Sequence, residues 1–173
     1  MDASGVGAAR LTSMLSDDDT RLLRAAIDLS WRAREAGNQP YGAVLADAQG
    51  QVLAEGVNTQ VTSADCTAHA EINLVRDVST RISRETLARC TVYASGEPCA
   101  MCAGAIYWAG IGRIVYALSI ETMTALAGDA ADELALHCRN VLRSGTRVTT
   151  VIGPALQAEA RRVFESGPGG PNP

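Results

Sequence analysis

The sequence predicts an α/β fold built around a mixed β-sheet, and three observations support this prediction. Segments with helical periodicity alternate with short apolar segments of strand character, which is the pattern of strands joined by crossover helices. The first two strand segments are separated only by the turn 47–50, so the sheet should begin with an antiparallel hairpin. The 173 residues contain no internal repeat or compositional break, so we expect one compact domain.

The domain should span residues 14–165, with flexible termini at 1–13 and 166–173. The last of these segments is rich in Gly and Pro, which favour neither helix nor strand. The first lacks the continuous apolar stretch of a secretory signal, and the most apolar segment, 100–112, is too short to span a bilayer. We therefore expect a cytoplasmic protein with no membrane contact.

The first helix should begin after Ser16, which can cap it, and end at Gly37. Three acidic residues directly after Ser16 would lie near the positive end of the helix. The remaining elements follow from the same periodicities. Strands are expected at 43–46, 51–54, 91–94, 113–118 and 147–152, and helices at about 68–78, 99–109, 120–126, 133–142 and 155–165.

The composition excludes several classes of function. All 15 basic residues are Arg. Without Lys, the chain cannot form a Schiff base, anchor pyridoxal phosphate or use a P-loop lysine. The net charge of −4 argues against a nucleic-acid surface, because phosphate binding usually needs clustered basic residues.

Two motifs carry the chemistry, namely His69-Ala70-Glu71 and Pro98-Cys99-Ala100-Met101-Cys102. One imidazole and two thiolates suit zinc, and Cys99 and Cys102 lie on one face at the start of a helix. Three protein ligands leave the fourth zinc position open for water, whose pKa the metal lowers. Glu71 lies two residues from the His69 ligand, so it can carry protons between water, substrate and leaving amine.

Other interpretations of these residues exist. His137 and Cys138 could supply a fourth ligand, but they fall in a separate predicted helix. The two motif cysteines could form a redox dithiol, although no thioredoxin-like pattern surrounds them. Cys66 and Cys90 fit no ligand spacing and are expected to be buried thiols. A zinc-stabilised scaffold without catalysis is a further alternative, which the presence of Glu71 argues against.

The H-x-E and P-C-x-x-C motifs together form the signature of zinc deaminases. The sequence resembles the cytidine-deaminase-like superfamily at 41–45, 54–58, 67–71 and 97–106, in the order of the family. The resemblance covers about residues 20–120. It implies a three-layer α/β/α sandwich with a central five-stranded mixed sheet, one Zn²⁺ per chain and usually a homodimer or larger assembly. It also implies hydrolytic removal of an exocyclic amino group from a nucleobase.

Within the superfamily, the segment that follows Cys102 is similar to the bacterial guanine deaminases. This similarity implies a substrate pocket. Asn58 would hydrogen-bond the base, and the Ala70 backbone would contact the leaving-group side. Trp108 would wall the pocket with Tyr41 packed nearby, and Asp129 would bind the 2-amino group. Structural roles are the alternative for these residues: core aromatics, a turn Asn and an Asp helix cap.

Two departures from the guanine deaminases leave the substrate open. The segment 166–170 lacks their aromatic lid, and the segment 119–136 differs from their pattern. Guanine, a related purine or an aminotriazine is the first expectation, with tRNA adenosine and cytosine or cytidine as alternatives. An RNA substrate would need a basic surface. The segment 119–136 instead holds four acidic residues, and between Ser119 and Arg139 there is no Arg or Lys. The expected partners are therefore a small-molecule nucleobase and a second copy of the chain, with no nucleic acid.

Overall fold

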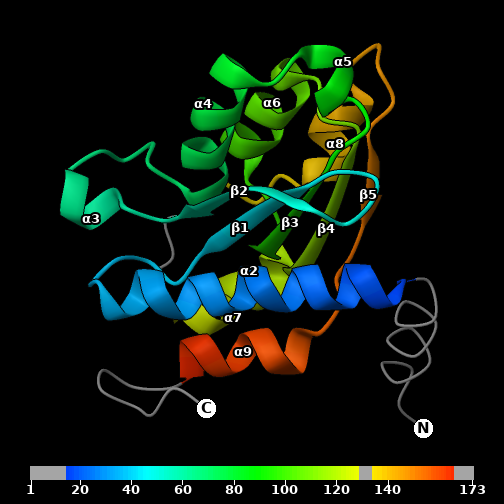
Figure 1. Cartoon of the computed structure of the whole chain (residues 1–173). Helices are drawn as coiled ribbons and strands as arrows, with labels where there is room; N and C mark the ends of the chain where they lie inside the picture. Colours follow the sequence, from blue (N-terminus) through cyan, green and yellow to red (C-terminus); the bar gives the residue numbers. More distant parts are fainter. Residues whose placement is uncertain (1–14, 129–133, 166–173) are drawn as a thin grey trace, which may run out of the picture.

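The centre of the fold is a five-stranded sheet with the strand order β2-β1-β3-β4-β5 (Figure 1). The structure is a computed structural model, and it describes residues 15–128 and 134–165. β1 pairs antiparallel with β2 and β3, whereas β3, β4 and β5 run parallel, so the predicted mixed sheet and its opening hairpin are confirmed. The strands are β1 (Gly42–Ala46), β2 (Val52–Val57), β3 (Thr91–Gly96), β4 (Arg113–Leu118) and β5 (Thr150–Ile152).

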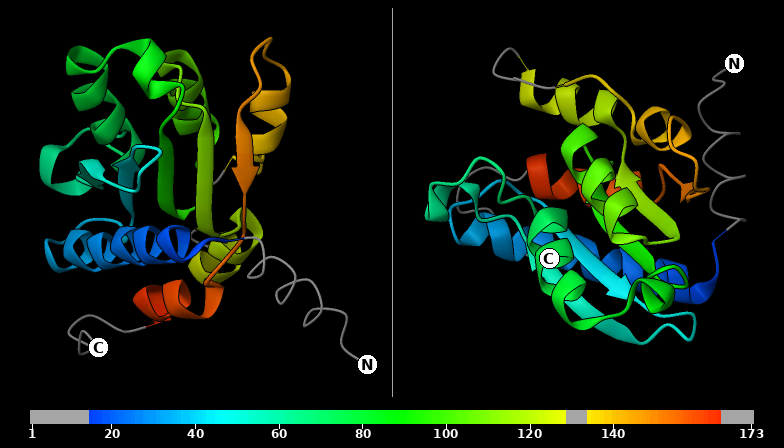
Figure 2. Two further views of the ribbon diagram at one scale, coloured as in Figure 1. Left: turned by 45° about the vertical axis from the view of Figure 1, so that its right-hand side comes forward. Right: turned by 90° about the horizontal axis from the view of Figure 1, so that it is seen from above.

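Helices cover both faces of this sheet, which confirms the α/β/α layering (Figures 1 and 2). One face carries α4 (Ala70–Arg81), α5 (Arg84–Leu87), α6 (Ala100–Ala109) and α8 (Cys138–Arg143). The other face carries α2 (Asp17–Glu35), α7 (Ile120–Ala127) and α9 (Gln157–Glu165). The short helix α3 (Gln60–Ser63) lies between β2 and α4. Within the described ranges, none of the helices combines the length and apolar character that crossing a membrane requires.

The central strands are buried on both faces, so successive side chains enter two different cores. In β3, Val92 and Ala94 pack in the core beneath α4 and α6, whereas Tyr93 packs in the core beneath α2. In β4, Ile114 and Val115 separate in the same way. This period of two is the normal geometry of a strand, and it explains the continuous apolar runs in the sequence.

Gly56 lets the start of α4 approach β2 closely. A Cβ atom at position 56 would lie 2.2 Å from the Ala70 carbonyl oxygen and 3.0 Å from the Leu74 Cβ. Only a residue without a side chain therefore fits here. This close approach positions the N-terminus of α4, where the first motif lies.

A buried ionic network attaches α2 to the sheet. Ser16 and Asp19 form a reciprocal capping box at the start of the helix. Asp19 also accepts hydrogen bonds from the Arg113 guanidinium at 2.6 Å and the Tyr93 hydroxyl at 2.8 Å. Burial would raise the pKa of Asp19, but these hydrogen bonds outweigh it and hold that pKa well below its ordinary value.

Two predicted elements begin at least three residues later in the structure than in the sequence analysis. The helix expected at 133–142 is only α8, and 134–137 form no regular element. Helix α8 begins at Cys138 because the Glu97 carboxylate accepts the Cys138 backbone N–H at 3.0 Å. The strand expected at 147–152 begins at Thr150, because the Arg147 backbone N–H donates to the Tyr107 hydroxyl at 3.2 Å and not to β4. The termini expected at 1–13 and 166–173 lie outside the described residues.

Candidate metal centre and active site

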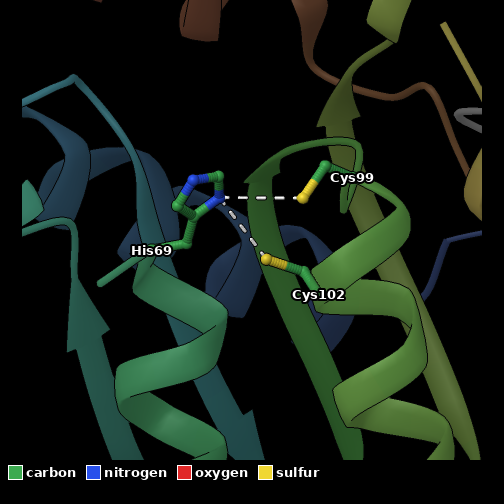
Figure 3. A group of neighbouring side chains, drawn as sticks. All are labelled: His69, Cys99 and Cys102. Carbon is green, nitrogen blue, oxygen red and sulfur yellow. Dashed lines mark hydrogen bonds between the residues drawn. The ribbon is translucent and has the colours of Figure 1, made fainter. Parts of the chain in front are cut away.

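The three predicted metal ligands lie together between the N-termini of α4 and α6 (Figure 3). His69 is the N-cap residue of α4, and Cys99 is the N-cap residue of α6. Cys102 lies in the first turn of α6 and is fully buried. The His69 Nδ1 atom is 3.7 Å from the Cys99 Sγ and 3.5 Å from the Cys102 Sγ.

The spacing of these donor atoms fits a tetrahedral zinc ion. Zn–S bonds of about 2.3 Å and Zn–N bonds of about 2.05 Å at the tetrahedral angle place nitrogen and sulfur about 3.6 Å apart. The two observed separations, 3.5 and 3.7 Å, bracket this value. Imidazole and thiolate are also the donor types that zinc prefers over magnesium or calcium. The site therefore fits one Zn²⁺ in both geometry and chemistry.

The two sulfurs also need a cation electrostatically. A hydrogen bond from the Cys102 thiol lowers the pKa of Cys99 to about 4. The same hydrogen bond, together with burial, raises the pKa of Cys102. The pair therefore carries one negative charge by itself, and a bound cation allows both sulfurs to be thiolates. The unpaired N–H groups at the start of α6 favour these anions further.

Glu71 lies beside the metal donors in the first turn of α4. Its carboxylate is buried, and its Oε2 atom lies 3.5 Å from the Cys102 Sγ. Burial raises the pKa of Glu71 to about 7. A carboxylate that exchanges a proton near neutral pH can act as both general base and general acid.

Among the described residues, the zinc site has three side-chain donors and no fourth. No other His, Cys, Asp or Glu side chain in 15–128 and 134–165 lies within 4.8 Å of the donor atoms of all three. Cys138, one alternative, is buried in the core beneath α8, and His137 points to two carboxylates. Three protein donors are the number expected for a catalytic zinc ion, whose fourth coordination position is used by water or substrate.

Of the predicted substrate contacts, Asn58 and Tyr41 are hydrogen-bonded to each other, and Ala70 directly follows the donor His69. The Asn58 backbone N–H donates to the Tyr41 carbonyl oxygen at 3.0 Å, which holds the two residues side by side. The buried Asn58 side chain accepts from the Gln60 N–H at 3.0 Å and donates to the Gln60 Oε1 at 2.7 Å. Its second amide N–H is left for another acceptor. Ala70 is the first residue of α4, where a backbone N–H has no partner within the helix.

Of the two other predicted contacts, Trp108 is not at this site and Asp129 is not among the described residues. Trp108 lies six residues after Cys102 on α6, which is roughly 9 Å along the helix axis. Its side chain is 73% exposed, so within one chain it neither walls the metal site nor belongs to the core. Asp129 lies outside the described residues. The prediction that Cys66 and Cys90 are both buried is half wrong, since Cys66 in the α3–α4 loop is exposed.

Glu97 is a residue to which the sequence analysis assigned no role. It is buried in the loop 97–99 between β3 and α6, here called the metal loop because it contains Cys99, and it accepts the backbone N–H groups of Ile120 and Cys138. His137 contacts Glu97 through Nδ1 at 3.2 Å and Glu121 through Nε2 at 3.0 Å. Opposite edges of the ring thus meet different carboxylates, which is the geometry of a hydrogen-bonded bridge. The sequence feature that could have indicated a role for Glu97 is its position as a charged residue directly after the apolar strand β3.

Comparison with known proteins agrees with this geometry. Residues 16–118 match the family described as the cytidine and deoxycytidylate deaminase zinc-binding region. A probable cytosine deaminase of Schizosaccharomyces pombe is 36% identical over 148 residues, covering 84% of this chain and 90% of that protein. The guanine deaminase of Bacillus subtilis is 42% identical over 96 residues, 55% of this chain and 61% of that protein.

A solved structure from work on tRNA:A34 deaminases has a TM-score of 0.66 and 28% identity, covering 83% of this chain and 99% of that one. The matched region contains His69, Glu71, Cys99 and Cys102. The fold and the donor set thus define a zinc-dependent hydrolase that acts on C–N bonds. The chain belongs to the cytidine and deoxycytidylate deaminase zinc-binding family.

Proposed function

We propose that this protein deaminates a free nucleobase by hydrolysis and releases ammonia, with guanine, a related purine or an aminotriazine as the first candidates. The observation that carries the proposal is the buried Glu71 carboxylate beside a three-residue metal donor set. Such a set suits catalysis, whereas a structural zinc site usually has four protein ligands.

His69, Cys99 and Cys102 would hold the zinc ion. When bound, the zinc supplies Lewis acidity and makes water acidic enough to ionise near neutral pH. Glu71 would accept one proton of the attacking water and pass it to a ring nitrogen, and would then take the second proton from the new hydroxyl group and pass it to the departing amine. Its pKa of about 7 suits transfer in both directions. Water and the base give the oxo product and ammonia, so the enzyme ends unchanged.

Residues next to the metal donors would orient the base. Asn58 would donate its remaining amide N–H to a ring acceptor, and the Ala70 backbone would face the amine that leaves. Tyr41 lies against Asn58 and would pack near the ring. A role for Asp129 in binding a 2-amino group remains part of this proposal.

A free base is favoured over tRNA by the charge around the metal loop. Glu121, which is exposed, contacts His137 beside the buried Glu97, and the net charge of the chain is −4. Carboxylates at this place would repel the phosphates of an anticodon stem.

Cytosine is the second candidate. The probable cytosine deaminase of Schizosaccharomyces pombe matches 84% of this chain, whereas the match to the guanine deaminase covers 55%. The match to the cytosine deaminase is the longer of the two, at 148 residues against 96. It therefore includes more of the chain outside the two metal motifs, which supports cytosine as a candidate.

A homodimer is also part of the proposal, and α6 would form its interface. Met101, Gly104, Ala105 and Trp108 follow one another at helical spacing along α6. Met101 and Trp108 are exposed, and space beside Gly104 is open. A helix that is apolar on all sides normally has all sides covered. A second copy of α6 would cover this stripe.

The experiment is an ammonia-release assay with the zinc-loaded protein and a panel of substrates. The panel contains guanine, cytosine, an aminotriazine, the corresponding nucleosides and an anticodon-stem RNA. Fastest turnover of guanine or the triazine supports the first candidate, and fastest turnover of cytosine supports the second. Turnover of nucleosides or RNA alone would overturn the proposal of a free-base substrate.

A further inference from the structure

A cavity of about 380 Å³ lies where α8 and the loop before β5 meet, and the deaminase proposal assigns it no role. Three arginines, Arg139, Arg143 and Arg147, line this cavity together with Thr146 and Thr149. Arg147 contacts the C-terminal end of α6 through the Tyr107 carbonyl oxygen. Cys99 and Cys102 lie at the opposite end of the same helix, so the cavity and the metal site are separate.

The three arginines have no acidic partner in the part of the chain that the structure describes. Arg139 donates to the carbonyl oxygens of Val151 and Gly153 at 2.6 and 3.0 Å. Arg147 donates to those of Tyr107 and Ile111 at 2.7 and 2.9 Å. Carbonyl oxygens fix the position of a guanidinium group but do not neutralise its charge.

The positive charge is concentrated further by a neighbour. Burial is the main effect that lowers the pKa of Arg147, and the nearby Arg84 guanidinium adds a smaller decrease in that pKa. Both effects mean that the surroundings of Arg147 disfavour its cation as they stand. An anion in the cavity would offset this cost.

Arg143 provides the free donors of the cavity. Its side chain is exposed on α8 and makes no hydrogen bond or ion pair within the described ranges. Thr146 and Thr149 also line the cavity, and the Thr149 hydroxyl accepts from the Arg147 guanidinium at 3.0 Å, so its own hydrogen can be donated to a ligand. A planar guanidinium whose N–H groups are not used within the described chain can donate to two oxygens of a phosphate group.

We propose that this cavity binds the phosphate group of a small molecule, such as a nucleoside monophosphate. Its volume lies at the lower end of the range for small-molecule sites, about 300–1,000 Å³. Three cationic side chains would more than neutralise the two negative charges of a phosphate dianion. Because the site lies at the far end of α6, its ligand would be an effector and would not compete with the base.

Isothermal titration of the zinc-loaded protein tests this proposal, with inorganic phosphate and a nucleoside monophosphate as probes at constant ionic strength. Arg143→Gln should weaken both by at least about tenfold, and Arg143→Glu should abolish binding. The matched control is Arg161→Gln, an exposed arginine on α9 across the sheet, which should leave the affinity unchanged. Melting temperatures of all variants report whether the fold is retained.

Equal affinity in the wild type and the folded Arg143 variants would overturn the proposal. So would the absence of phosphate binding at millimolar concentration, or binding of an RNA oligonucleotide without binding of either small probe. The titration does not depend on turnover. Failure of the deaminase proposal would therefore leave this result unaffected.

Discussion

The Cys102 sulfur lies 3.5 Å from the Oε2 atom of Glu71, so a metal donor on α6 contacts the proton-carrying carboxylate on α4. The two residues belong to α4 and α6, whose first turns face each other in Figure 3. Gly56 permits this approach, because any side chain there would meet the Ala70 carbonyl oxygen. The packing of α4 against β2 thus determines the distance between acid–base group and metal.

Cys102→Ser should abolish tight zinc binding. A serine hydroxyl is a much poorer zinc ligand than a thiolate, and only two donors would remain. Metal analysis should give about one zinc per chain for the wild type and far less for the variant. The control is Cys66→Ser, which changes an exposed cysteine outside the group of metal donors. Loss of zinc from the control, or its retention by the variant, would contradict the assigned donor set.

Removal of zinc by a chelator should stop ammonia release without unfolding the protein. The two cores on either side of the sheet contain most of the buried apolar residues, and they do not depend on the metal. Circular dichroism should retain the helical signal, and added Zn²⁺ should restore activity. Cooperative unfolding on chelation would instead identify zinc as a scaffold element.

Asp19→Asn should destabilise the protein by about 3 kcal/mol at pH 7, because it leaves the Arg113 cation without its partner. The folded pKa of Asp19 lies below its ordinary value of 3.8. The ionised carboxylate therefore contributes stability above about pH 4, and this contribution is lost as the pH falls through the folded pKa. Urea denaturation should show the gap between wild type and variant narrowing towards pH 3. A gap that does not depend on pH would refute the ionic role.

Ala105→Arg should convert the proposed dimer into a monomer. Ala105 lies in the apolar stripe of α6, and a buried guanidinium without a partner is costly at an interface. Size-exclusion chromatography with light scattering should give twice the chain mass for the wild type and the single mass for the variant. Arg161→Gln on α9 serves as the control and should stay dimeric. A monomeric wild type would remove the dimer from the account.

The sequence predicts the sheet and the metal donors well for a common physical reason. β1, β3 and β4 are buried on both faces and appear as apolar runs, while α2 shows a capping residue and one apolar face. The donors are equally visible, since zinc requires particular side chains at close spacing. His69, Cys99 and Cys102 therefore follow from residue type and position alone.

The parts that the sequence does not predict depend on long-range contacts. The start of α8 is set by the Glu97 carboxylate, which comes from a segment far away in the chain. The exposure of Trp108 depends on what surrounds the end of α6, and no local pattern records that. The Arg143 cavity likewise combines α8 with the loop before β5, so its charge emerges only in the folded chain.

The most direct test of the central claim is the ammonia-release rate of Glu71→Gln, measured together with its zinc content. The account predicts one zinc per chain and a rate lower by about a thousandfold, because an amide cannot carry the proton. Glu55→Gln on β2, which removes only an exposed carboxylate paired with Arg32, should retain the wild-type rate. A zinc-loaded Glu71→Gln protein that releases ammonia at nearly the wild-type rate would contradict the account.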